Sequence, residues 1–526
     1  MENICALTVA ELAPAIGRGE ISAADAVEAY IARLEEVNPA LNALVFRRYA
    51  EARAEAREVD RRRAAGEPLG PLAGVPVTIK ECLDLEGAAS TFGVPSRRET
   101  RAVVDEKHVA RLRGAGAIVL GKTNVAQLLM FIETDNPIFG RTNNPHAVDR
   151  SAGGSSGGEG ALLAAGASAL GLGTDLGGSL RVPAAFCGVV AIKPTTGRCD
   201  DLGRGSAPLG QRAIASQVGV LGRDVQGVAL GLKVINGGDR PALDGSLSPA
   251  MPLPEYGSID ASNLRVGFYV DDGTFTPAPA VRRAVREAAA ALSRRGATVV
   301  EWAPPEVARA RDLFFGLLAA DGFAGLERTL GRDRRDPRIA KMMMAGRAKR
   351  LIGLLLSLSG RGRLKREVVA NYGYRDTDHY WRLVEETIDY RGRFLEALSG
   401  HDVVICPAVA LPAFRHGASE ELILAGAYTA LYNVLGWPAG VVPVTRVRAD
   451  EESDRFPTKD PMDRTARETE RGSAGLPIGV QVVARPWRED LVLAVMGEIE
   501  RSRAGEQLRS QVRTPARTQV ARRLLQ

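Results

Sequence analysis

Hydrophobic positions along the chain follow helical spacing in some segments and form short apolar strands in others. Helical spacing follows Ser22, a predicted N-cap with Asp25 three residues later, and Asn38-Pro39 predicts the end of this helix. Further helices are predicted over 47–64, 108–114, 123–131 and 280–296, and strands over 71–79, 117–120, 264–269, 298–301, 401–406, 441–444 and 478–483. This alternation predicts an α/β fold with a central mixed, mostly parallel twisted β-sheet flanked by helices.

The stretch Ser151–Arg198 combines two properties that rarely occur together. It holds two tight Gly-Ser turns, Gly153–Gly158 and Gly177–Ser179, within apolar sequence. Flexible linkers rich in Gly and Ser stay polar because they have nothing to bury. Glycine lets the backbone reach positive φ and approach a ligand closely. The pattern therefore predicts a constructed site rather than a hinge.

A basic and apolar segment, 338–366, leaves two interpretations open. Its basic residues flank two apolar runs, Met342–Met344 and Leu351–Leu358; they are Lys341, Arg347, Lys349 and Arg350. One interpretation is a core helix pair that lines a pocket, and the other is an amphipathic segment that lies on a membrane surface. The apolar run is too short to span a bilayer. Elsewhere, 449–473 is polar and unpatterned and predicts a surface insertion, and 501–526 predicts a basic tail.

Composition narrows the class of protein. Hydrophobic residues make up 45% and charged residues 25% of the 526 residues, which is typical of a soluble globular protein. The net charge of +6 permits contact with an anionic membrane surface but is weak evidence for nucleic acid, so no nucleic-acid partner is predicted. The five scattered cysteines form no CxxC pair, which argues against disulfides or a metal site and favours the cytoplasm. The N-terminus shows neither a signal peptide nor a spanning segment.

Common phosphate- and dinucleotide-binding motifs do not explain the glycine-rich turns. GGSSGG at 153–158 lacks the G-x-x-x-x-G-K-[ST] spacing of a phosphate-binding loop, and no strand-GxGxxG-helix unit is present. The five histidines lie in ordinary polar contexts and offer no base for a Ser-His-Asp triad. No cofactor is predicted.

The remaining candidates for chemistry are two serines in glycine-rich turns and Lys80 at the end of a strand. A lysine in that position usually extends to solvent. If it is buried, desolvation lowers its pKa and lets it act as a base for a serine nucleophile. The turn Gly177–Ser179 would offer consecutive backbone N–H groups to an oxyanion.

The two turns read GGSSGG at 153–158 and GTDLGGSLRVPA at 173–184, and VPVTIKE ends a strand upstream. These motifs resemble those of the amidase signature family, whose members use a Ser–Ser–Lys triad in one large catalytic domain. The resemblance implies that Ser179 is the acylated nucleophile, that Ser155 is a bridging serine after a cis peptide bond, and that Lys80 is the base.

The same resemblance assigns the surrounding residues. It implies that backbone N–H groups of the second turn hold the oxyanion, namely those of Leu176, Gly177, Gly178 and Ser179. Ser156 and Arg181 are expected to brace the loops by hydrogen bonds, with Thr174 as a further supporting residue. Asp175 is expected to cap the turn rather than to act as an acid.

Within that family the sequence is most similar to fatty acid amide hydrolases, through segments such as NPIFGRTNNP at 136–145 and GLPIGVQVVARPWRED at 475–490. The resemblance implies a small-molecule amide substrate with a hydrophobic acyl group, contacts of Leu129 and Met130 with that group, and a homodimer. It also implies three parts: an N-terminal helical segment over 1–70, a catalytic domain over 71–500 with a helical cap region, and the tail.

Two alternatives to an amide hydrolase remain. One is the glutaminase and transamidase subunit of a tRNA amidotransferase, which shares the signature and needs partner subunits. The apolar stretches Leu129–Phe131 and 342–358 argue against a small polar substrate. The other is a non-catalytic, membrane-associated binding protein, against which the intact Lys80, Ser155 and Ser179 weigh.

Overall fold

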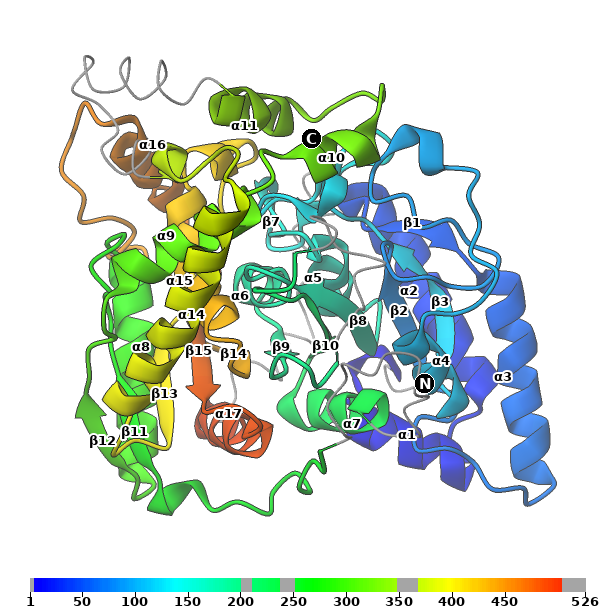
Figure 1. The fold of residues 1–526 in the computed structure, drawn as a ribbon. Coiled ribbons are helices and arrows are strands. Elements are labelled where there is room, and N and C mark those ends of the chain that lie inside the picture. Colours follow the sequence, from blue (N-terminus) through cyan, green and yellow to red (C-terminus); the bar gives the residue numbers. More distant parts are fainter. Residues whose placement is uncertain (1–3, 200–210, 237–250, 348–367, 504–526) are drawn as a thin grey trace.

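Eleven strands form one sheet that runs through the molecule (Figure 1). The computed structural model describes residues 4–199, 211–236, 251–347 and 368–503. In spatial order the strands are β1 (Leu44–Arg47), β3 (Ile118–Thr123), β2 (Pro76–Lys80), β8 (Leu170–Asp175), β10 (Gln217–Gly222), β9 (Val190–Lys193), β14 (Ala439–Arg446), β15 (Pro477–Ala484), β13 (Val403–Pro407), β11 (Arg265–Phe268) and β12 (Thr298–Glu301). Two short hairpins stand apart, β4 (Asp135–Asn136) with β5 (Gly140–Arg141) and β6 (Asn143–Asn144) with β7 (Ala147–Ser151).

The predicted α/β fold with a mixed sheet is confirmed, but the expected dominance of parallel pairing is not. Parallel pairs are confined to the two flanks, β3–β2–β8 on one side and β13–β11–β12 on the other. From β8 through β13 the neighbours pair antiparallel. The apolar runs of β2 and β15 are buried along their whole length, as expected for strands covered on both faces.

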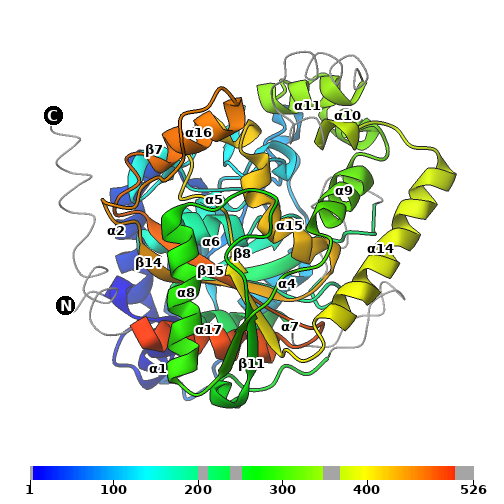
Figure 2. The same ribbon diagram turned by 90° about the vertical axis from the view of Figure 1, so that its left-hand side faces the viewer.

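Helices cover both faces of the sheet. The helices of the first half are α1 (Val9–Arg18), α2 (Ala23–Leu41), α3 (Tyr49–Ala64), α4 (Lys107–Gly114), α5 (Gly157–Ala164), α6 (Arg181–Cys187) and α7 (Val225–Asn236). Those of the second half are α8 (Pro279–Arg294), α9 (Val307–Leu318), α10 (Ala324–Leu330), α11 (Pro337–Arg347), α14 (Thr377–Ala397), α15 (Ala427–Val434), α16 (Pro461–Glu470) and α17 (Glu489–Arg503). The helices α1, α2 and α3 gather at the β1 end of the sheet, and α8 and α14 lie at the β12 end (Figures 1 and 2).

Two positions on neighbouring strands show which helices lie on which face. A Cβ added to Gly440 of β14 would meet Met496 of α17 at 2.2 Å. The next residue, Val441, pairs with Gln481 of β15, and Gln481 bonds Arg181 of α6. Because successive residues of a strand point to opposite faces, α17 and α6 lie on opposite sides of the sheet.

The helix predicted over 123–131 is wrong. The strand β3 continues to Thr123, and only a 3₁₀ turn, Gln127–Leu129, follows it. Leu128 and Leu129 have φ of 52° and 60°, outside the helical region. The N–H of Leu128 donates to the carbonyl of Phe92 at 2.8 Å, so a tertiary contact replaces the helical hydrogen bond.

The predicted N-cap of α2 is confirmed, since the Ser22 side chain accepts from the N–H of Asp25. The helix nevertheless passes through Asn38-Pro39 and ends at Leu41. The Asn38 side chain accepts from the N–H groups of Ala43 and Leu44 and so terminates the helix one turn later than predicted.

Polar and basic segments are tied to the protein by ion pairs. In α11, Lys341 pairs with Glu420 at 2.9 Å and Arg347 with Glu327 at 2.6 Å. The rest of the predicted segment 338–366, from residue 348 on, lies outside the described residues, as do 504–526 of the tail.

The predicted insertion 449–473 is not unpatterned, because it contains α16 with Met462 and Ala466 buried. No helix in the described ranges combines the length and hydropathy needed to cross a bilayer.

Candidate active site

Ser155 lies in the first glycine-rich turn, between β7 and the start of α5, and is fully buried. The Gly154–Ser155 peptide bond is cis, as the resemblance implied. The turn has no room for side chains on its glycines. A Cβ added to Gly154 would lie 2.7 Å from the backbone of Glu133, and one added to Gly153 would lie 2.9 Å from that of Pro183. Close packing of backbone on backbone therefore explains the glycines.

Lys80 ends β2 and is fully buried, so it does not extend to solvent as an ordinary strand-end lysine would. Its Nζ lies 2.8 Å from Ser155 Oγ, 2.9 Å from Thr174 Oγ1 and 3.3 Å from the Thr174 carbonyl oxygen. The buried Nζ thus lies within hydrogen-bond distance of the Ser155 hydroxyl, and Thr174 holds it there through two oxygens.

Ser179 lies in the second turn, between β8 and α6, where its side chain is half-buried. The Ser156 N–H donates to the Ser179 carbonyl at 3.2 Å, so the two turns are joined through their backbones. The Ser156 hydroxyl lies 3.5 Å from the Thr174 carbonyl, which agrees with its predicted bracing role. Among the described residues no hydrogen bond joins the hydroxyls of Ser179 and Ser155. In free enzymes such catalytic contacts often tighten only when substrate binds.

A buried network around Asp175 holds the second turn in place. The carboxylate accepts from the N–H groups of Gly178 at 2.8 Å and Leu180 at 3.1 Å. Arg181 donates to both of its oxygens, at 2.9 and 3.0 Å. Burial by itself would raise the pKa of Asp175, but the charge of Arg181 holds it well below its ordinary value. Asp175 therefore caps the turn as an anion, as predicted.

Arg181 connects this network to α15 and β15. Its guanidinium donates to the Thr429 carbonyl at 2.9 Å, to Gln481 at 2.6 Å and to Asn433 at 2.6 Å. Asn433 also donates to Asp175 at 3.0 Å. The sequence did not single out these three partners. Gln481 lies in a segment quoted only for its resemblance, and no local pattern marks an amide as the partner of a distant arginine.

The second glycine-rich turn offers three backbone N–H donors to an oxyanion, rather than the four predicted. The N–H of Gly178, predicted to hold the oxyanion, is taken by Asp175. Within the described chain, the N–H groups of Leu176, Gly177 and Ser179 have no acceptor. Gly178 has a φ of 122°, and a Cβ added to it would lie 2.1 Å from Thr429 Oγ1. Its role in this conformation is to shape the turn.

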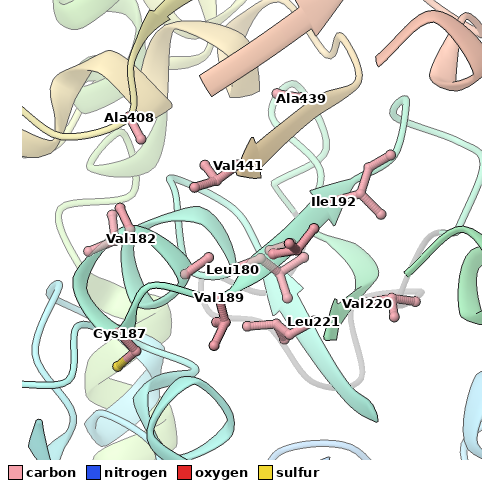
Figure 3. Packing of buried hydrophobic residues seen from close by; sticks show 14 of the residues in the cluster. Leu180, Val182, Cys187, Val189, Ile192, Val220, Leu221, Ala408, Ala439 and Val441 are labelled. Carbon is pink, nitrogen blue, oxygen red and sulfur yellow. The ribbon is translucent and has the colours of Figure 1, made fainter. Parts of the chain in front are cut away.

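An apolar layer fixes the residue that follows the candidate nucleophile. Figure 3 shows Leu180 among the buried side chains between α6 and the sheet. Cβ atoms added to Gly173 of β8 and Gly219 of β10 would lie 2.8 and 2.5 Å from its methyl groups. The two glycines leave the space that Leu180 fills, so the nucleophile turn is anchored on both the polar and the apolar side.

An apolar pocket opens beside Gly177. It is lined by residues of the loop before β4, the second glycine-rich turn, α9, the segment before α15 and α15 itself. They are Ile132, Gly177, Val307, Ala310, Arg311, Phe314, Phe315, Ile423, Gly426, Ala427, Ala430 and Leu431. Phe314 lies over Gly177, since a Cβ added there would be 2.7 Å from its ring. Leu129 and Met130, predicted to contact the acyl group, do not line this pocket and pack against the core instead.

Comparison with known proteins agrees with these motifs. The family model described as Amidase matches residues 25–493. Fatty-acid amide hydrolase 1 of Sus scrofa is 36% identical over 509 residues, covering 95% of this chain and 86% of the relative. A glutamyl-tRNA(Gln) amidotransferase subunit of Roseiflexus castenholzii is 32% identical over 503 residues, covering 94% of this chain and 95% of the relative.

Solved structures have the same architecture. A structure titled fatty acid amide hydrolase aligns with a TM-score of 0.82 over 95% of this chain and 86% of that chain, at 24% sequence identity. At that identity the likeness shows the fold alone. With a family model that covers most of the chain and relatives above 30% identity over nearly its whole length, the chain belongs to the amidase signature family of amide hydrolases.

Proposed function

We propose that this amidase cleaves the C–N bond of linear carboxylic amides with a hydrophobic acyl group, through an acyl-enzyme on Ser179. The observation that carries the proposal is the buried contact of 2.8 Å between Lys80 Nζ and Ser155 Oγ, placed beside the Ser179 turn. The apolar pocket at Gly177 supports the choice of acyl group.

In the proposed first step, neutral Lys80 accepts the proton of Ser155, and Ser155 accepts the proton of Ser179. The Ser179 oxygen then attacks the amide carbonyl carbon. Burial favours the neutral amine because it removes the water that would solvate an ammonium ion. The N–H groups of Leu176, Gly177 and Ser179 stabilise the negative charge on the tetrahedral oxygen.

In the second step the C–N bond breaks and the proton returns from Lys80 through Ser155 to the leaving nitrogen. An amide nitrogen is a poor leaving group unless it is protonated, so the same residues act first as base and then as acid. A water molecule then gives one proton to the same relay and attacks the acyl-enzyme. The carboxylic acid leaves, and Ser179 regains its proton.

Transamidation is the second candidate, because relatives named as glutamyl-tRNA(Gln) amidotransferase subunits match almost the whole chain. The pocket argues against it. Its walls are mostly apolar, with Phe314, Phe315 and Leu431, and Arg311 is the one charged side chain that the lining residues offer to the polar end of a glutamine side chain.

A ladder of acyl amides from acetyl to oleoyl, assayed beside glutamine, tests the proposal. We expect kcat/KM to rise with acyl length by about tenfold for each one to two methylenes that enter the pocket, until the pocket is full. Ammonia release from glutamine by the isolated chain, with no rise along the ladder, would favour the transamidase subunit. Failure to hydrolyse any amide, or a simple ester or anilide, would favour a binding protein.

A further inference from the structure

Glu159 is a buried acidic residue that the proposed mechanism does not use. It lies in the first turn of α5, four residues after Ser155, and is fully buried. No arginine or lysine in the described part of the chain forms an ion pair with it. A Cβ added to Gly171 would lie 2.1 Å from Glu159 Oε2, so β8 leaves space for this carboxyl group. Buried carboxylates are normally paired, and one without a cation needs an explanation.

The hydrogen bonds around Glu159 give that explanation. Its Oε2 lies 2.6 Å from Thr78 Oγ1, which lies 3.0 Å from Ser168 Oγ, which lies 2.8 Å from the Leu170 carbonyl oxygen. Each of these three hydrogen bonds needs its own proton. The hydroxyls of Thr78 and Ser168 supply one proton each, and the carbonyl supplies none. A protonated Glu159 supplies the third. Its other oxygen then accepts from Thr123 Oγ1 at 2.8 Å.

Glu159 is electrostatically coupled to the candidate base. Thr78, its hydrogen-bond partner, is two residues before Lys80 on β2, so both side chains point to the same face. The helix α5 packs against α6, β2, β8 and β10. The titratable groups of these elements and of neighbouring β3 are Lys80, Lys122, Asp175, Arg181 and Cys187. Burial raises the pKa of Glu159 to about 8, although the hydrogen bonds with Thr78 and Thr123 and the nearby charge of Lys80 act in the opposite direction.

We propose that Glu159 is a positioning residue held as a neutral carboxylic acid, so that no negative charge favours the ammonium form of Lys80. An ionised carboxylate at this place would stabilise the cation and remove the lone pair on which Ser155 depends. The inference rests on the proposed function, in which Lys80 is the base.

Two conservative variants distinguish a neutral from an ionised Glu159. The measured quantity is the pH at the midpoint of the acid limb of the kcat/KM profile. The amide of Glu159→Gln copies the neutral acid, because it donates to Thr78 and accepts from Thr123. We expect the midpoint to stay at the wild-type pH. In Ser168→Ala the Thr78 proton becomes free to donate to Glu159, which favours the carboxylate. We expect this midpoint to move up by about half a pH unit or more.

The opposite pattern would overturn the inference. If Glu159 is ionised in the wild type, Glu159→Gln removes an anion beside Lys80 and moves the midpoint down by about one unit or more, while Ser168→Ala leaves it in place. The Ser168→Ala result alone decides the case if Glu159→Gln does not fold. Failure of the proposed function is seen separately, as wild-type protein whose Ser179 reacts with no serine-directed probe.

Discussion

The two sides of the candidate site are built from different interactions. Around Asp175 and Arg181, buried charges and amides form hydrogen bonds of 2.6 to 3.1 Å that join β8, α6, α15 and β15. The pocket side, by contrast, consists mostly of apolar side chains, largely of α9 and α15, several of them only half-buried, such as Phe314 and Phe315. Loss of one member of the polar network leaves unpaired buried charge, whereas an apolar wall tolerates changes of shape. We infer that the first region sets the chemistry and the second the choice of substrate.

The largest effect is expected from Lys80→Met, which keeps the volume of the side chain but removes the base. We expect kcat to fall by about 10³-fold near pH 7 and its acid limb to disappear. The matched control is Lys122→Met on the neighbouring strand. Lys122 is also fully buried but donates to Ala89 and Ser90, away from the serines. Equal losses in the two variants would mean that both act through folding.

Arg181→Met tests the polar side through stability. It leaves the Asp175 carboxylate buried without its cation, so we expect the free energy of unfolding to fall by about 3–5 kcal/mol in urea titrations. Arg18→Met, which removes an exposed partner of Glu20, is expected to leave the unfolding midpoint in place. An unchanged midpoint in Arg181→Met would show that the network does not hold the turn.

The smallest effect is expected on the pocket side. Ala430→Phe fills the pocket, so KM for long acyl amides should rise by about tenfold while hydrolysis of the acetyl amide is unchanged. Ala308→Phe on the exposed face of α9 is the control. If the acetyl and long acyl amides lose activity alike, the pocket is not the acyl site.

Site residues that lie in contiguous motifs could be predicted from the sequence, whereas their distant partners could not. Lys80, Ser155, Ser179 and Asp175 are predicted through the resemblance, because contiguous motifs mark their positions, and the structure brings Lys80 and Ser155 into contact. The cis bond before Ser155 followed from the same resemblance and is present. The partners of Arg181 on α15 and β15 lie 248 to 300 residues away along the chain, and no local pattern connects them.

The errors of the fold prediction have physical causes of the same kind. Apolar residues over 123–131 look helical, yet the N–H of Leu128 is committed to Phe92 across the structure. Leu129 has a left-handed backbone and packs against the core, and its contact with an acyl group stays a prediction. The direction of strand pairing in the centre of the sheet depends on how crossovers are routed, which apolar runs do not encode.

The central claim, that Ser179 is the nucleophile activated through Ser155 by Lys80, is tested most directly by a fluorophosphonate probe with peptide mapping of the modified residue. The account predicts a single adduct on Ser179, no adduct in Ser179→Ala, and labelling slowed by about 10³-fold in Lys80→Met. An adduct on another residue, or labelling of Ser179 at the wild-type rate without Lys80, would contradict it.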